Sequence, residues 1–149
     1  MTKRELSAIL ARASKEELGE IAGQIKKECE ISVIKQPQKT LVMVKARESI
    51  FKSLFYLGEV LATECMVMVD KVKGASVIAG DEFDKAVSAA IIDGFLNGTP
   101  KEGQNDGKKE SADQVLMQIE KLGKAQEKQR ESRNRQLRKS KVNFNVMGE

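Results

Sequence analysis

The first part of the chain shows apolar residues at helical spacing behind two similar start signals. Thr2 stands three residues before Glu5, and Ser14 stands three residues before Glu17. This spacing is typical of a capping box, in which a hydroxyl and a carboxylate satisfy free backbone N–H groups. The apolar stripes that follow are Leu6, Ile9 and Leu10, and then Leu18, Ile21, Ala22 and Ile25. The pattern predicts two short helices, at about residues 2–12 and 14–28.

After residue 29 the spacing of the apolar residues changes from helical to alternating. Runs rich in Val, Ile, Met and Leu are separated by short polar segments at residues 37–39, 58–59 and 70–74. Such short connections favour antiparallel neighbours, because parallel strands need a long crossover. The pattern predicts an antiparallel sheet of four or five strands. The predicted strands are residues 30–36, 40–47, 51–57, 60–69 and 75–79.

The rest of the chain is predicted to be helical, with one interruption. Asp81 is the expected N-cap of a packing helix at about residues 82–97, and Ser111 that of a long helix whose apolar stripe stops at Gly123. The fold class is therefore α+β, with a helical N-terminus, the sheet, a packing helix and a long basic C-terminal helix. We expect one domain, made of an α+β core at 1–97, a flexible linker at 98–109, and a C-terminal helix and apolar tail at 110–149 that dock onto the core or a partner.

The composition argues against several classes of chemistry. The chain has no His, so the commonest general base and the commonest metal ligand are both missing. Cys29 and Cys65 form no CxxC motif, and we interpret them as reduced structural thiols. No glycine-rich loop of the kind that cradles phosphates is present. We expect this chain to contribute no catalytic residue, no metal ligand and no cofactor site.

Two features of the sequence bear on where the protein is located in the cell. They are the length of the apolar runs and the charge of the first residues. No stretch approaches the roughly 18 apolar residues that span a bilayer. The first residues are charged and lack the apolar run of a signal peptide. We therefore expect a cytoplasmic protein without a membrane partner.

Positive charge is concentrated near the C-terminus. Residues 120–141 contain nine basic and three acidic residues, a net charge of +6, whereas the rest of the chain has a net charge of −2. This segment is open to three interpretations, namely a solvated helix, a nucleic-acid contact, or a docking arm for a larger protein. It carries no aromatic side chains for base stacking, and an apolar tail with Val142, Phe144 and Met147 follows it. Docking is favoured, with charge for steering and the tail as an anchor.

Further candidate residues lie on the predicted sheet and packing helix. Lys45 and Arg47 occupy alternate positions of one strand and share a face, where they are candidates for an anion contact, although a solvated face also explains them. Asp93 lies beside an apolar helix face, which predicts a buried hydrogen bond or a partner contact. The proposed partner surface comprises Cys65, Met66, Met68, Asp93, Arg138, Val142, Phe144 and Met147.

Five segments in this order resemble the G subunit of the carbon–phosphorus lyase core complex. They read LVMVKAR at 41–47, FYLGEV at 55–60, ATECMV at 62–67, GASVIAG at 74–80 and AAIIDGF at 89–95. That family closes with a basic helix and a Val-Asp-Phe-Phe-like motif, and this chain ends in a basic segment followed by KVNF at 141–144. The likeness covers nearly the whole length.

Some positions depart from that family's usual pattern. Ser49 to Lys52 replace a glycine-rich turn, Glu64 replaces a frequent basic residue, Lys85 replaces a common His, and Asn143 replaces the tail aspartate. These departures indicate a divergent branch of the family.

The resemblance implies an essential but non-catalytic subunit of a transferase that is not active alone. Its expected partners are the H, I and J subunits, with the I subunit as the direct contact, and the L subunit for the transferase reaction. The substrates of that complex are ATP and a phosphonate, and its product is alpha-D-ribose 1-methylphosphonate 5-triphosphate. The alternative is a nucleic-acid-associated or regulatory binding module that uses the basic helix.

Overall fold

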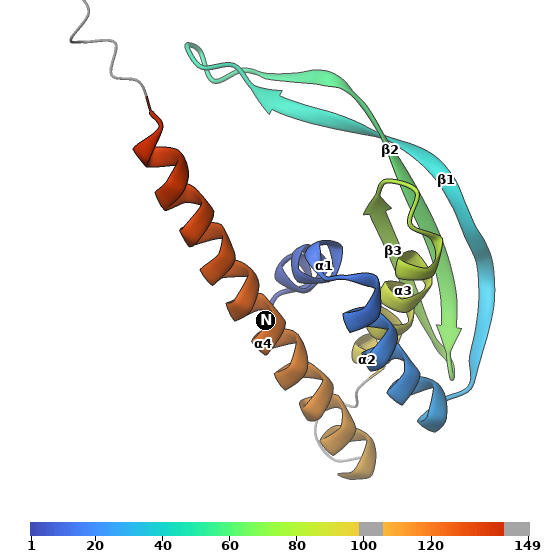
Figure 1. The fold of residues 1–149 in the computed structure, drawn as a ribbon. Helices are drawn as coiled ribbons and strands as arrows, with labels where there is room; N and C mark the ends of the chain where they lie inside the picture. The colour runs from blue at the N-terminus through green and yellow to red at the C-terminus, as the bar shows by residue number, and fades with distance from the viewer. Residues whose placement is uncertain (99–105, 142–149) are drawn as a thin grey trace, which may run out of the picture.

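The computed structural model describes residues 1–98 and 106–141, in which two helices, three strands and two further helices follow one another (Figure 1). The predicted α+β class is confirmed. The helices are α1 (Lys3–Arg12), α2 (Lys15–Glu28), α3 (Phe83–Asn97) and α4 (Asp106–Lys139). The strands are β1 (Ile31–Arg47), β2 (Leu54–Val69) and β3 (Val72–Ala79).

Both predicted capping boxes are present at the starts of α1 and α2. The Thr2 backbone N–H donates to Glu5 Oε2 over 2.7 Å, and the Glu5 N–H donates back to Thr2 Oγ1 over 3.2 Å. Ser14 and Glu17 form the same reciprocal pair. Only Ala13 and Ser14 separate α1 from α2, and the two helices bring their apolar stripes into one core.

The sheet has three antiparallel strands in the order β1-β2-β3, so the prediction of four or five strands is wrong. β1 continues through the predicted turn at Pro37, where its pairing with β2 shifts between Lys35 and Gln38. β1 is an edge strand, and an edge position tolerates a residue without an N–H. β2 likewise continues through Gly58 and Glu59, which pair with Val44 and Met43 rather than forming a turn.

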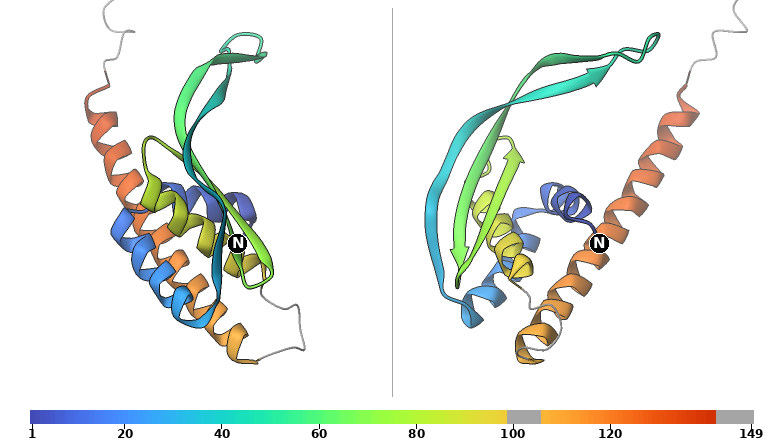
Figure 2. Two further views of the ribbon diagram at one scale, coloured as in Figure 1. Left: turned by 90° about the vertical axis from the view of Figure 1, so that its right-hand side faces the viewer. Right: turned by 180° about the vertical axis from the view of Figure 1, so that it is seen from behind.

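All helices lie on the concave side of the curved sheet (Figures 1 and 2). α3 contacts β2 and β3 directly, and α2 packs on α3. Cys65, Val67 and Val69 point from β2 into this layer and are fully or almost fully buried. The approach of α3 to β3 is closest where Gly94 faces Gly74, and neither residue has room for a side chain.

α3 begins differently from the prediction, because its N-cap is Glu82 and not Asp81. No side chain of the cap bonds the helix start. The buried hydroxyl of Thr63 fixes this turn instead, since Oγ1 accepts from the Glu82 N–H and donates to the Gly80 carbonyl. Asp81 forms an ion pair with Lys39 of β1 over 2.8 Å.

α4 is longer than predicted, since it begins at Asp106 and Ser111 lies inside it. Residues 106–109 of the predicted linker are therefore helical, and residues 99–105 lie outside the described part. The first half of α4 joins the core through Ala112, Val115 and Ile119. Contact with α1 continues past Gly123, next to Ile9, to Gln126. The second half of α4 extends beyond the core (Figure 2).

Candidate partner-binding surface

The ends of β1 and β2 extend beyond the third strand as a two-stranded ribbon. β3 pairs with β2 only from Val69 to Ala62. From Leu41 opposite Leu61 to Arg47 opposite Leu54, β2 pairs with β1 alone. We call residues 41–61 the ribbon, and Figure 1 shows it reaching away from the helices.

Both faces of the ribbon carry exposed apolar side chains. Leu41 and Leu61 face each other across the strands and are 61% and 43% exposed. The next pair, Val42 and Val60, points to the opposite face because successive strand residues alternate, and is 39% and 42% exposed. The other exposed apolar residues of the ribbon are Met43, Ile50, Phe51, Leu54, Phe55, Tyr56 and Leu57.

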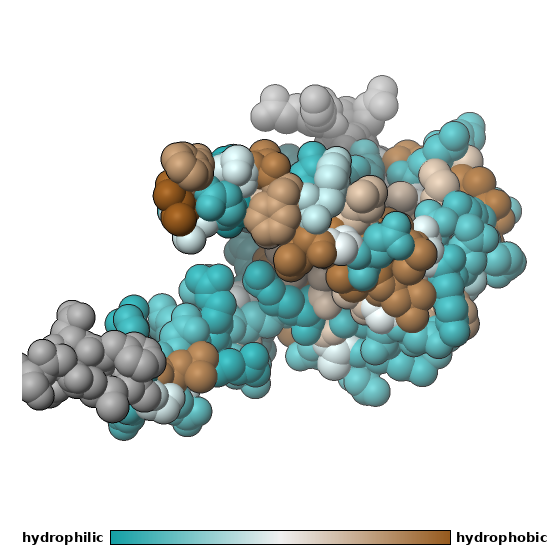
Figure 3. Space-filling model, turned by 90° about the horizontal axis from the view of Figure 1, so that it is seen from above, coloured by the Kyte–Doolittle hydropathy of each residue, from teal (hydrophilic) through white to brown (hydrophobic). Residues whose placement is uncertain are grey.

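This arrangement is unusual for a surface that faces water. An isolated two-stranded hairpin is marginally stable, and a monomeric protein rarely exposes a large contiguous apolar patch. Figure 3 shows brown apolar surface along the ribbon and mostly teal surface on the far part of α4. A ribbon that is apolar on both faces is therefore suited to insertion into another protein.

The tip of the ribbon is closed by polar contacts instead of glycines. The Glu48 carboxylate accepts from the backbone N–H groups of Ile50 and Phe51. The Glu48 N–H donates to the Ser53 carbonyl over 3.1 Å, and Lys52 takes a left-handed φ of 57°. These contacts close the turn without a glycine, and they leave Phe51, 85% exposed, at the far end.

Lys45 and Arg47 lie at the base of this tip, and both already have partners. The Lys45 ammonium lies over the Tyr56 ring, 5.2 Å from its centre. Arg47 Nη1 donates to the Lys52 carbonyl over 3.0 Å. A guanidinium has five N–H donors, so Arg47 keeps donors for a further ligand. An anion contact at these residues stays a prediction.

The other candidates on the sheet separate into two sets. Met66 and Met68 are half-buried on the face away from the helices, where a partner can reach them. Cys65 has no exposed surface and lies in the core, so its predicted place on a partner surface is wrong. The alternation of Cys65, Val67 and Val69 with the two methionines is the sequence signal that assigns each residue to its face. Burial also raises the pKa of the Cys65 thiol, which disfavours a reactive thiolate.

Asp93 has the buried hydrogen bonds that were one of its two predicted roles. The side chain, in a residue that is 6% exposed, accepts from the Ala75 N–H and from Asn97 Nδ2, each over 3.1 Å. Lys3 Nζ lies 3.6 Å from the second carboxylate oxygen. Asp93 thus ties α3 to β3 and to the start of α1.

Replacing Asp93 by Ala is expected to reduce the free energy of unfolding by about 1–3 kcal/mol, because it removes the acceptor of the part-buried hydrogen bond from the Ala75 N–H. Urea unfolding followed by circular dichroism measures the change. Asp84→Ala on the same helix is the matched control. It removes an exposed ion pair with Lys15 and is expected to cost about 0–1 kcal/mol. Equal losses in the two variants would contradict a structural role for Asp93.

The second half of α4 has no apolar face, and Leu137 is the exposed exception. Arg138 is exposed near its end, in agreement with a contact surface. Val142, Phe144 and Met147 lie outside the described residues, as does Asn143. Within residues 1–98 and 106–141, no helix has both the length and the apolar character needed to cross a bilayer.

The polar groups around the β2–β3 turn serve structure. Asp70, in the β2–β3 turn, bonds Lys108 Nζ over 2.6 Å and accepts from the Glu30 N–H. The Lys108 and Glu30 bonds lower the pKa of Asp70, in that order of strength. Burial raises the pKa of the nearby Cys29 thiol, and the Asp70 charge raises it further. No group of three or more Cys, Asp or Glu side chains in the described ranges is placed to bind a metal ion.

Comparison with known protein families identifies the family of this chain. The sequence profile of a family described as phosphonate metabolism protein PhnG matches residues 1–148. The chain belongs to the PhnG family. The resemblance read from the ordered strand and helix segments is confirmed, and PhnG proteins act in phosphonate metabolism. A comparison with curated protein sequences finds no match.

One departure from the usual PhnG pattern has a clear role in this structure. Lys85 Nζ donates to the Ala11 carbonyl over 2.9 Å, and Ala11 lies in the last turn of α1. The last carbonyls of a helix lack partners within the helix, and a cation stabilises that end. Lys85 therefore connects α3 to α1. Glu64 is also engaged, since it accepts from Lys35 and Gln38 on the outer face of the sheet.

Proposed function

We propose that this chain is a non-catalytic subunit of the carbon–phosphorus lyase core complex. With its partner subunits it supports transfer of the ribose triphosphate moiety of ATP to a phosphonate, which gives alpha-D-ribose 1-methylphosphonate 5-triphosphate. ATP and the phosphonate are substrates of the complex, and the chemistry is performed on the partner subunits. The expected partners are the H, I and J subunits, with L for the transferase reaction.

The ribbon is the observation that carries this proposal. Its apolar side chains on both faces are exposed, and β3 gives it no support beyond Ala62. Each leucine or phenylalanine that becomes buried contributes about 1.5–3 kcal/mol. A chain that works alone has no use for this exposed surface, whereas a subunit gains its binding free energy from covering it.

The available side chains support the assignment of the chemistry to partners. The chain has no His, and the pKa of each of its two thiols is raised. The chain therefore has no histidine to act as a general base, and its thiols are not activated as thiolates. The described residues instead provide two extended contact surfaces. The ribbon and the far part of α4 extend on the same side of the core (Figure 2).

The direct partner is expected to present an apolar groove for the ribbon and negative charge for α4. Between Lys124 and Lys141 the described helix end has eight basic and two acidic residues. Such a charged surface speeds encounter and selects partners, while the apolar contact holds the complex. The I subunit, as the large transferase subunit, is the proposed occupant.

Co-expression with the H, I and J subunits tests the proposal. We expect the chain to elute with the I subunit in size-exclusion chromatography at 0.5 M NaCl, because burial of apolar surface resists salt whereas nucleic-acid binding does not. The control is the same chain expressed without partners. A chain that elutes as a monomer in both cases would contradict the proposal. Salt-dependent binding of DNA by the chain alone would favour the nucleic-acid alternative.

A further inference from the structure

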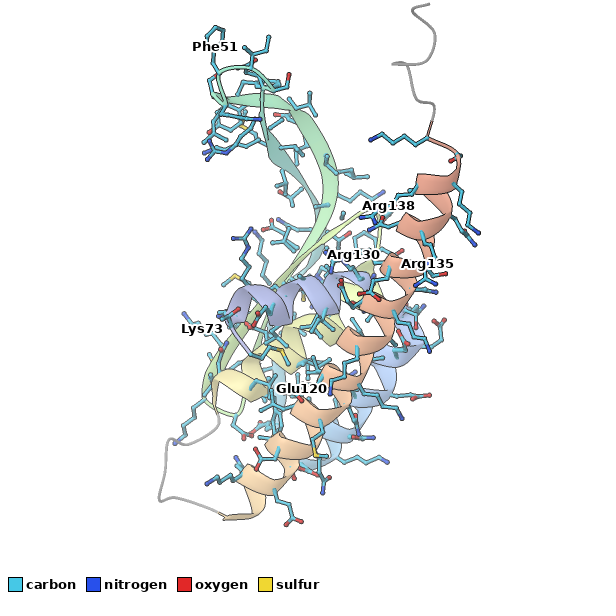
Figure 4. All side chains as sticks on the ribbon, turned by 90° about the vertical axis from the view of Figure 1, so that its left-hand side faces the viewer. Phe51, Lys73, Glu120, Arg130, Arg135 and Arg138 are labelled. Atoms are coloured by element: carbon cyan, nitrogen blue, oxygen red, sulfur yellow. The ribbon has the colours of Figure 1, made fainter. Side chains whose placement is uncertain are left out.

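A basic hollow lies where α4 passes the end of α1, away from the ribbon. Its lining is Arg12 from α1 and Gln126, Gln129, Arg130 and Arg133 from α4. Its volume is about 320 Å³. Figure 4 labels Arg130 at this junction of the two helices. The hollow is formed by segments more than 100 residues apart in the sequence, and only folding brings them together.

Positive charge in this hollow is poorly compensated. Arg130 pairs with Glu127 over 2.9 Å, but no carboxylate is among the lining residues. Within the part of the chain that the structure describes, neither Arg12 nor Arg133 forms an ion pair. Guanidinium groups stay charged, so Arg12 and Arg133, which no ion pair neutralises among the described residues, attract an anion that enters the hollow.

A neutral group in the same hollow also lacks a partner. Gln126 Nε2 donates to the Ile9 carbonyl over 3.1 Å, which fixes the amide at the helix contact. Its Oε1 is buried and accepts no hydrogen bond from the described residues. Because this oxygen has almost no accessible surface, it is out of reach of a ligand. The guanidinium groups of Arg12, Arg130 and Arg133 are the charged groups of the lining, so the hollow favours a ligand with anionic oxygens.

We propose that this hollow binds a phosphorylated small molecule. Phosphate oxygens match the fork of N–H donors on each guanidinium. The volume exceeds the needs of one inorganic phosphate and leaves room for an oligophosphate or a sugar phosphate. The inference rests on these residues alone and not on the role proposed above for the ribbon.

The position of Arg12 has a simpler explanation that does not extend to the others. A cation in the last turn of α1 is stabilised by the helix dipole, so Arg12 is favourable there without any ligand. Arg130 and Arg133 lie more than one turn before the C-terminal end of α4, where the helix end no longer provides this benefit. Their placement opposite Arg12 is what indicates an anion site.

Titration of the full-length chain with sodium tripolyphosphate and with ribose 5-phosphate, followed by isothermal titration calorimetry, tests the proposal. Arg133→Gln is expected to raise the Kd about tenfold, as for the loss of a charge-assisted hydrogen bond. The matched control is Arg135→Gln, which removes the same charge two residues away on α4. Two residues turn the helix by roughly 200°, so Arg135 leaves the hollow's side and its loss is expected to change the Kd less than twofold.

Equal weakening in both variants would overturn the proposal, because it indicates a diffuse charge effect. Absence of binding by the unaltered chain would overturn it as well. If Arg133→Gln instead weakens association with a partner subunit and leaves ligand uptake unchanged, the hollow is a protein contact and the proposal fails.

Discussion

Gly74→Ala is expected to disrupt the packing of α3 on the sheet and to lower the free energy of unfolding by about 3 kcal/mol or more. A Cβ atom at this position falls on the Ala90 carbonyl oxygen and within 2.5 Å of the Gly94 backbone nitrogen. Both obstacles are backbone atoms, which cannot rotate away as a side chain can. Relief requires α3 to move off β3, and this separation also breaks the Asp93 bond to the Ala75 N–H.

Thermal unfolding of the full-length chain, followed by far-UV circular dichroism, measures this effect. For a chain of 149 residues a loss of about 3 kcal/mol corresponds to a fall of roughly 10 °C in Tm. Gly58→Ala is the matched control, since it also adds one methyl group to a strand glycine. Nothing lies within 4 Å of a Cβ there, so its Tm is expected to stay the same or rise slightly. A Gly74→Ala chain with unchanged Tm would contradict the close approach of α3 and β3.

The helical part of the fold could be predicted from the sequence because its signals are local. Thr2 with Glu5, and Ser14 with Glu17, each satisfy backbone groups within one turn, so no distant residue was needed to recognise the helix starts. The start of α3 agrees with the prediction to within one residue, but its N-cap is Glu82 and not Asp81. The Glu82 N–H bonds Thr63, which is far away in the sequence, so no local signal marks this N-cap.

The sheet is predicted less accurately because Pro37 and Gly58 are expected to end strands. Both residues interrupt strands in many proteins, but here Pro37 lies on the edge strand and Gly58 in extended backbone. The extent of the ribbon could not be predicted at all. It follows from the end of β3 at Ala79, which leaves eight residues of β2 without a third strand, and pairing lengths are not local properties.

The apolar character of the ribbon was nevertheless visible in the sequence. Residues 54–61 read LFYLGEVL, in which apolar residues occur at both odd and even positions. Such a run is typical of a strand covered on both faces. No helix among the described residues covers either face of this segment, so its cover has to come from elsewhere. Burial against a partner protein explains why this segment is apolar on both faces although the fold leaves it exposed.

Leu41→Thr combined with Leu61→Thr is expected to raise the Kd for the I subunit about 100-fold. These residues form one cross-strand pair on one face of the ribbon, and the loss of about 1.4 kcal/mol at each gives this factor. Thr keeps a high strand propensity, so the ribbon is expected to stay paired. Because both leucines are exposed in the free chain, the Tm of the variant is expected to change little.

Surface plasmon resonance with immobilised I subunit measures the Kd, and circular dichroism confirms that the variant is folded. Val77→Thr is the control, because Val77 is 56% exposed on β3 and lies outside the ribbon. It is expected to leave the Kd within about twofold of the unaltered chain. A loss of affinity equal to that of the ribbon variant would show that any exposed apolar residue has the same effect and would argue against a defined surface.

The opposite face of the ribbon allows the mode of binding to be determined. Val42→Thr combined with Val60→Thr changes the adjacent cross-strand pair, which points the other way. If the partner encloses the ribbon, both pair variants weaken binding, whereas a ribbon lying flat on a partner loses affinity with one pair alone. Binding that survives both pair variants would remove the ribbon as the docking surface. In that case the exposed apolar surface would need another occupant, and a second copy of the chain, detected by sedimentation equilibrium, is the first to examine.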